Sequence, residues 1–171
     1  MSGVAYEKSI RWVLDTFGNH CCTVKGTSML PMLRQGIDTV ALERVDSPSA
    51  LSPLDVILFQ REDGSYVLHR IVRVEHGANA FLVFGDNCES AEVVAYSQVL
   101  GVMTKYYRGE SERSLTSPTY RAYVTLCCRP WQVRMCLNRA LHAAQRAVGR
   151  ISRHVSRSLS MAPNGNVSEG R

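Results

Sequence analysis

The chain of 171 residues contains no long apolar run. Its most apolar N-terminal stretch, "IRWVLDTFG" at residues 10–18, is interrupted by Arg11 and Asp15. It is much shorter than the roughly 20 apolar residues that cross a bilayer as a helix. The stretch also lacks the order of charged, apolar and small residues that marks a secretory signal. The sequence therefore predicts neither an export signal nor a membrane-spanning anchor.

The spacing of cysteines that zinc and redox sites use is also absent. The six cysteines form two adjacent pairs, at 21–22 and 127–128, and two single residues, Cys88 and Cys136. No C-x-x-C occurs, and neighbouring cysteines do not easily bridge each other. We therefore expect reduced thiols in a cytoplasmic protein. We expect no metal and no cofactor.

Acidic residues are scarce near the C-terminus. Residues 121–171 hold nine arginines and one acid, Glu169, for a net charge of +8, whereas residues 1–120 hold eleven Lys and Arg against fourteen acids, a net of −3. A segregated basic segment usually serves an anionic surface. This charge pattern predicts a mildly acidic body with a strongly basic tail.

Short strands dominate the middle of the chain. Runs rich in Val, Ile, Leu, Phe and Tyr alternate with Gly, Pro, Asn, Asp and Ser, and "REDGSY" between two such runs indicates a hairpin. The strand segments are "CCTVKG", "DTVALERV", "DVILFQ", "YVLHRIVRVE", "AFLVFGD" and "VLGVMTKYYR". This pattern predicts a mainly β, antiparallel domain over residues 20–107, preceded by a short helix within residues 1–19.

Beyond that domain, residues 108–119 are polar and rich in breakers, so we expect a linker. Residues 120–160 then read as a basic amphipathic helical tail, with 161–171 as a disordered end. Five arginines lie opposite an apolar stripe: Arg139, Arg146, Arg150, Arg153 and Arg157. The stripe consists of Val133, Leu137, Leu141, Ala144, Val148, Ile151, Val155 and Leu159.

Residues with catalytic chemistry appear in three segments. "KGTSMLPMLRQG", residues 25–36, presents Ser28 on an apolar shelf, and a serine hydroxyl requires a neighbouring base to act as a nucleophile. His69 lies within the strand "SYVLHRIVRVE", where a core histidine is the ordinary alternative. "FGDN" places Asp86 behind Gly85 at a strand end, which is also common turn chemistry.

Taken together and in this order, "GTSMLPML", "DVILF", "VLHRIV", "FGDN" and "VLGVM" resemble signal peptidase I and its relatives in the S24/S26 type of serine peptidase. The branch with a histidine base, found in eukaryotic and archaeal signal peptidases, is the more similar one. The resemblance covers residues 20–107 and implies a signal-peptidase/LexA-like catalytic domain. It also implies that Ser28 is the nucleophile, His69 the general base and Asp86 the acid that orients the imidazole. Glu92 lies where the family often has a second acid and is the alternative for that third role.

The sequence departs from the family pattern at several points. A hydroxyl residue two positions before the nucleophile is replaced by Gly26, and Cys88 stands where many members have a second asparagine after Gly-Asp-Asn. "GIDTV" carries extra residues where the family has Gly-Asp-Val. The family's N-terminal membrane anchor has no counterpart in the sequence pattern.

The resulting expectation is a serine endopeptidase that cleaves a precursor or leader peptide and does not bind nucleic acid. Two alternatives are a catalytically idle binding module and a LexA-like self-cleaving regulator. The second is disfavoured because only 27 residues precede Ser28 and the expected base is not lysine.

For the tail, one interpretation is a helix that packs its apolar stripe on the β domain. The other is an interfacial helix on an anionic membrane, which would place a cytoplasmic enzyme peripherally on the inner face.

Overall fold

The core of the protein is one antiparallel sheet. A computed structural model describes residues 9–160, with side chains described as far as Arg150. The strands run in the order β1-β2-β7-β3-β4-β5-β6, and β8 pairs with β7. They are β1 (Asn19–Thr23), β2 (Asp38–Arg44), β3 (Val56–Gln60), β4 (Tyr66–Glu75), β5 (Ala80–Phe84), β6 (Glu92–Ala95), β7 (Val99–Arg108) and β8 (Ser111–Ser114). The mainly antiparallel β fold expected from the sequence is confirmed.

Both faces of the sheet are covered. Successive side chains of a strand point to opposite faces, and on β3 Val56 and Leu58 enter one apolar cluster while Ile57 and Phe59 enter another. The first cluster also contains Met29, Met32 and Leu33 from the segment after β1 and Leu14 from the N-terminal helix. This double burial explains why β3 is a continuous apolar run.

The N-terminal helix α1 (Ile10–Phe17) is capped at both ends. The Ser9 side chain accepts a hydrogen bond from the Trp12 backbone N–H, and Gly18 ends the helix in the left-handed conformation. Leu14 is buried, whereas Phe17 at the end of the predicted apolar face is exposed. The predicted helix is therefore present, within the part of residues 1–19 that the structure describes.

Two strands were not predicted. β6 follows the Gly-Asp-Asn turn, is only four residues long and pairs with β5. β8 lies within residues 108–119 and pairs with β7, so the segment that we expected to be a linker contains a β-hairpin. The strand is entirely exposed and has the sequence "SERS", which carries no apolar alternation. Such a strand has no hydrophobic signal for sequence patterns to detect.

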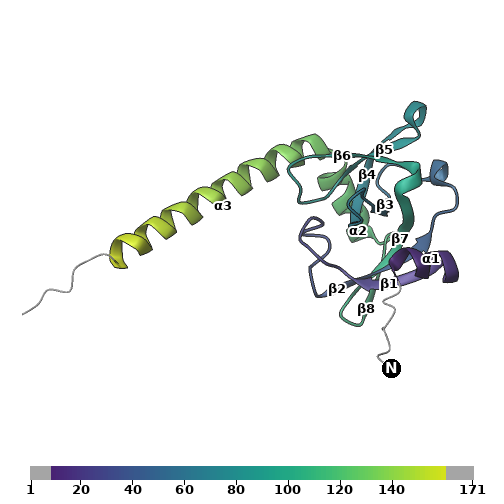
Figure 1. Ribbon diagram of the computed structural model, residues 1–171, viewed down its shortest axis with the longest axis horizontal. Coiled ribbons are helices and arrows are strands. Elements are labelled where there is room, and N and C mark those ends of the chain that lie inside the picture. Colours follow the sequence, from purple (N-terminus) through teal and green to yellow (C-terminus); the bar gives the residue numbers. More distant parts are fainter. Residues whose placement is uncertain (1–8, 161–171) are drawn as a thin grey trace, which may run out of the picture.

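The C-terminal part is helical, as predicted. α2 (Pro118–Tyr123) leads through a π-helical segment (Val124–Cys128) into α3 (Trp131–Ser160), which projects away from the sheet as a long single helix (Figure 1). The predicted disordered end, 161–171, lies outside the described residues. Over residues 9–160, no helix is both long enough and apolar enough to span a membrane.

The stripe of α3 does not pack on the sheet. Val133, Leu137, Leu141 and Val148 are all exposed, whereas Asn138 on another side of the helix is buried. The interpretation that the stripe packs on the β domain is therefore wrong for these residues. Polar groups of the sheet's loops bind α3 instead, and the candidate site includes these contacts.

Candidate active site

Ser28 lies in the turn that follows β1. The side chains of Met29, Met32 and Leu33 after it are buried and anchor the segment in the core. The backbone N–H of Asn87 donates to the Ser28 carbonyl at 2.7 Å, and the Asn87 side chain donates to the Thr27 carbonyl at 3.3 Å. The Gly-Asp-Asn turn therefore fixes the backbone at Ser28, and the Ser28 side chain stays half-buried.

His69 lies on β4, opposite Ile57 of β3, and is buried. Its Nδ1 lies 2.9 Å from Glu92 Oε1. Glu92 begins β6 and in turn accepts two hydrogen bonds from the Arg61 guanidinium, at 2.8 and 2.9 Å. An acid on Nδ1 selects the tautomer that carries its proton there and leaves Nε2 as the acceptor.

The charges in this group follow from burial and pairing. Burial lowers the pKa of His69 below its ordinary value of 6.5, although the Glu92 carboxylate opposes the change. Burial works against ionisation of Glu92, but hydrogen bonding from Arg61 and the proximity of His69 bring its pKa below the ordinary value. Both shifts favour a neutral imidazole beside a carboxylate near neutral pH, which is the protonation state that a general base needs.

The other imidazole nitrogen contacts a thiol. Cys88 Sγ lies 3.7 Å from His69 Nε2, and Gly85 lies beneath both groups. A Cβ at position 85 would come within 2.6 Å of Nε2 and 2.5 Å of Sγ, so only glycine fits this close approach. Among the described hydrogen bonds, none joins Ser28 Oγ to His69. The resting partner of Nε2 is therefore Cys88.

Asp86 does not contact the imidazole that we expected it to orient. It is buried, and both carboxylate oxygens bind the Arg70 guanidinium, at 2.8 and 3.0 Å. The Tyr123 hydroxyl also donates to it at 2.9 Å. The expectation that Asp86 orients His69 does not agree with this geometry. Because the side chain at position 70 points to the face opposite its neighbour at 69, the acid that pairs with Arg70 is not the one at the imidazole.

Helix α3 holds the two loops of the site together. Arg134 donates to the carbonyls of Asp86 and Leu30, and Asn138 donates to the carbonyls of Asp86 and Cys88, at 3.2 and 2.9 Å. The next residue, Arg139, donates to the Glu89 carbonyl. Sequence analysis did not select Arg134 or Asn138, because their role depends on carbonyl groups that carry no sequence signal.

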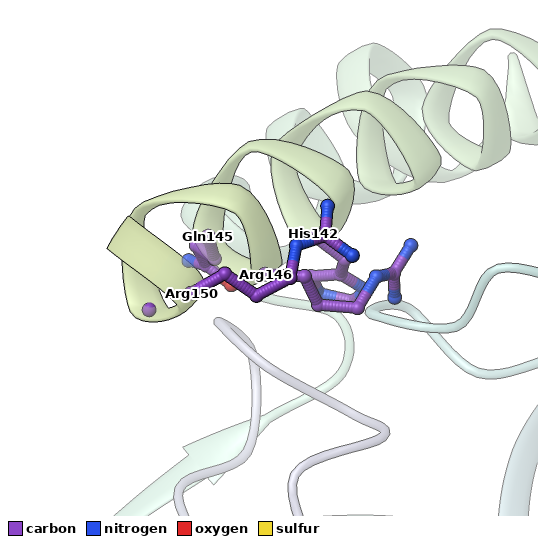
Figure 2. A pocket seen from close by; sticks show the side chains of 5 residues that line it. His142, Gln145, Arg146 and Arg150 are labelled. Carbon is purple, nitrogen blue, oxygen red and sulfur yellow. The ribbon is translucent and has the colours of Figure 1, made fainter. Parts of the chain in front are cut away.

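Ser28 opens into a groove with a wall formed by α3. The groove has a volume of about 680 Å³, and its lining includes Ser28, Leu30, Cys88, His142 and Gln145. A second hollow of about 540 Å³ continues along α3, where Figure 2 shows Arg146 and Arg150 beside His142 and Gln145. His142 and Arg146 both contact Glu89 Oε1, at 3.0 and 2.6 Å.

A separate, mainly apolar cavity of about 580 Å³ is lined by α1, β1 to β4 and the residues just after β1. It runs beside the edge strand β1 and ends at Val24 and Lys25, shortly before Ser28 in the chain. Leu58, Tyr66 and Leu68 form much of its wall. A sheet edge with an adjoining apolar cavity is suited to an extended peptide, because the edge offers backbone hydrogen bonds and the cavity accepts side chains.

No disulfide joins any of the six cysteines. Among residues 9–160, no group of three or more His, Cys, Asp or Glu side chains is arranged to hold a metal ion. No protein-family model matches the chain, and a search of curated proteins finds no similar protein.

Proposed function

We propose that this protein is a serine endopeptidase of the signal peptidase type, with Ser28 as nucleophile, His69 as general base and Glu92 as the acid that orients His69. The observation that carries this proposal is the 2.9 Å contact between His69 Nδ1 and Glu92, which leaves Nε2 as an acceptor toward Cys88 in the groove that exposes Ser28. The finer fold class, a signal-peptidase/LexA-like catalytic domain, belongs to the same proposal.

In this mechanism His69 Nε2 removes the Ser28 proton as the hydroxyl oxygen attacks a peptide carbonyl. The Glu92 carboxylate stabilises the imidazolium that forms, and His69 then returns the proton to the leaving amine. Hydrolysis of the acyl-serine by water repeats these steps and regenerates the enzyme. Backbone N–H groups near Ser28 are the expected donors to the oxyanion.

The substrate would be an extended precursor or leader peptide. Its backbone would pair with the edge of β1, and an apolar side chain would enter the cavity beside Leu58 and Leu68. The scissile carbonyl would then lie beyond Lys25, at Ser28. Because Cys88 contacts Nε2 at rest, we infer that the Ser28 hydroxyl replaces this contact when substrate binds, as catalytic hydrogen bonds often tighten only in the complex.

A fluorophosphonate probe, which labels activated serines, tests the proposal directly. The wild-type protein should be labelled at Ser28, and labelling should be lost in Ser28→Ala and fall by about two orders of magnitude or more in His69→Ala. Cys88→Ala is the matched control, because it removes the resting partner of Nε2 and leaves serine and base in place; it should still be labelled. Labelling of Ser28→Ala at the wild-type rate would overturn the proposal.

A catalytically idle module would give a different result. The probe would then label the wild type and all three variants no faster than it labels an ordinary serine on a protein surface. If Cys88→Ala alone lost labelling, the thiol would be required for activation and the Ser28–His69 assignment would be wrong.

A further inference from the structure

The apolar stripe of α3 is exposed along the described part of the helix. The exposed fractions of Val133, Leu137, Leu141 and Val148 are 59, 58, 60 and 67 %. These residues are spaced by four, four and seven positions, which places them along one side of a helix. From Val133 to Val148 the stripe extends for about 22 Å at 1.5 Å per residue. Contiguous apolar surface of this length on a water-facing helix marks a binding surface.

Polar side chains of α3 attach the helix to the loops of the sheet. Arg134 and Asn138 bind carbonyl groups of the active-site loops, and Arg146 binds the Glu89 carboxylate. These polar contacts attach the helix to the domain, while the four stripe residues stay exposed. Figure 1 shows α3 leaving the sheet with no other element alongside its outer part. The stripe is therefore not a face that this domain buries in itself.

Charge identifies the partner. The sequence of α3 holds six arginines and no acidic residue. Two copies of this helix placed stripe to stripe would offer no acidic side chain on either helix to pair with the arginines of the other, so charge does not favour a second copy. An anionic surface is complementary to this charge, and apolar residues with arginines on a single helix are the composition of interfacial helices.

We propose that α3 docks on an anionic phospholipid bilayer, with Val133, Leu137, Leu141 and Val148 inserted at the boundary between headgroups and acyl chains. Arg150 and the arginines that follow it in the sequence, Arg153 and Arg157, supply attraction to the anionic headgroups. The side chains of Ile151, Val155 and Leu159, which continue the stripe in the sequence, lie outside the described residues. Docking by this face would hold the Ser28 groove, whose wall is α3, at a constant position next to the membrane.

Co-sedimentation of the full-length protein with vesicles tests this proposal without reference to peptide cleavage. The protein should pellet with vesicles of equal parts phosphatidylcholine and phosphatidylglycerol at low salt. It should stay in the supernatant with phosphatidylcholine alone, and high salt should weaken binding because it screens the arginines. Leu137→Glu/Leu141→Glu should weaken partitioning by about tenfold or more, since two inserted side chains are lost.

Phe17→Glu/Ile37→Glu is the matched control. It introduces the same charges at two exposed apolar residues outside α3, which are 60 and 56 % exposed, and it should bind like the wild type apart from the small effect of two added charges. Far-UV circular dichroism would verify that both variants are folded. Equal loss in both variants, or a wild-type protein that stays in the supernatant with anionic vesicles at low salt, would overturn the proposal. So would a wild-type dimer that Leu137→Glu/Leu141→Glu converts to monomers while leaving vesicle binding unchanged, because the stripe would then bind a second copy.

Discussion

Glu92 and Asp86 contact neighbouring residues of β4 but have different partners. Glu92 contacts His69, and Asp86 binds Arg70 with both oxygens. His69 and Arg70 are adjacent on β4 and therefore point to opposite faces. Glu92 pairs with the imidazole of His69. Asp86 forms a buried ion pair with Arg70 and also accepts a hydrogen bond from the Tyr123 hydroxyl of α2. This division gives the two acids separable effects on mutation.

We therefore predict that Glu92→Gln lowers kcat by about two orders of magnitude or more with little change in stability, because the amide no longer stabilises the imidazolium. Asp86→Asn should instead reduce the free energy of unfolding by about 3 kcal/mol or more, since it leaves the buried Arg70 charge uncompensated. Peptide-cleavage kinetics and urea unfolding of both variants measure the two effects. A stable Asp86→Asn protein with no activity would return the orienting role to Asp86.

The protonation of His69 predicts the pH dependence of cleavage. A general base works in its neutral form, so kcat/KM rises with pH through the pKa of the free enzyme's base. Because burial lowers the pKa of His69, this rise should be complete at a lower pH than an ordinary histidine with a pKa of 6.5 would allow. Glu92 raises the pKa of His69, so Glu92→Gln should move the rise to still lower pH.

A pH profile of kcat/KM with a substrate that has no titrating group measures this directly. An acidic limb centred at or above pH 6.5 in the wild type would contradict the prediction. The lowered pKa of His69 also affects stability. As the pH falls below the unfolded-state pKa, the unfolded chain binds a proton that the folded protein does not, so the free energy of unfolding decreases until the folded-state pKa is reached.

At the scale of elements, α3 is part of the same domain as the sheet. Its first half supplies the donors that satisfy the carbonyls of Leu30, Asp86 and Cys88, which lie in the two loops that hold Ser28 and the Gly-Asp-Asn turn. Backbone acceptors removed from water need such partners, and leaving one unpaired costs about 1–3 kcal/mol. The helix thereby fixes the separation of the two loops on either side of the groove.

Asn138→Ala should consequently reduce the free energy of unfolding by about 1–2 kcal/mol and lower cleavage activity, because Cys88 and the loop around it lose their link to α3. Gln132→Ala on the exposed side of the same helix is the control and should change stability by less than about 0.5 kcal/mol. Urea unfolding and cleavage kinetics provide both readouts. Equal behaviour of the two variants would mean that α3 does not hold the loops.

At the scale of the whole molecule, the start of the basic segment does not mark the end of the folded domain. The basic segment begins near residue 121, yet the hydrogen bonds that join α3 to the loops of the sheet come from Arg134 to Arg146. Trp131 also packs near Phe84, with 6.1 Å between ring centroids. The basic tail is therefore integrated into the domain in its first half and extends beyond it in its second.

A chain that ends after Arg150 should therefore unfold within about 0.5 kcal/mol of the full protein. A chain that ends after Pro130 should lose several kcal/mol, because it lacks Trp131, Arg134 and Asn138 and leaves buried carbonyls unpaired. Urea unfolding of the two truncated proteins, compared at equal ionic strength, separates the two halves of the tail. Equal destabilisation by both truncations would contradict this division.

The sequence by itself was sufficient for the features that depend on local pattern. Apolar runs broken by turn residues predicted six of the strands and the β3–β4 hairpin, and the spacing of apolar residues predicted α1 and a long C-terminal helix. Ser28, His69 and the two acids were selected from short motifs in chain order. The predictions of strands and helices succeeded because hydrophobic periodicity and turn chemistry act over a few residues. The roles of the selected residues remain a proposal.

Only the tertiary structure decided which groups meet. β6, whose pattern is too short and mixed to predict, brings Glu92 to His69 through its pairing with β5. Asp86, in the Gly-Asp-Asn turn, binds Arg70 and not His69, because neighbouring side chains along β4 point to opposite faces. The binding of α3 depends on backbone carbonyls, which every residue has and no sequence motif marks. An amphipathic pattern gives the two faces of a helix, but only the structure shows that Asn138 is buried and that the apolar stripe is exposed.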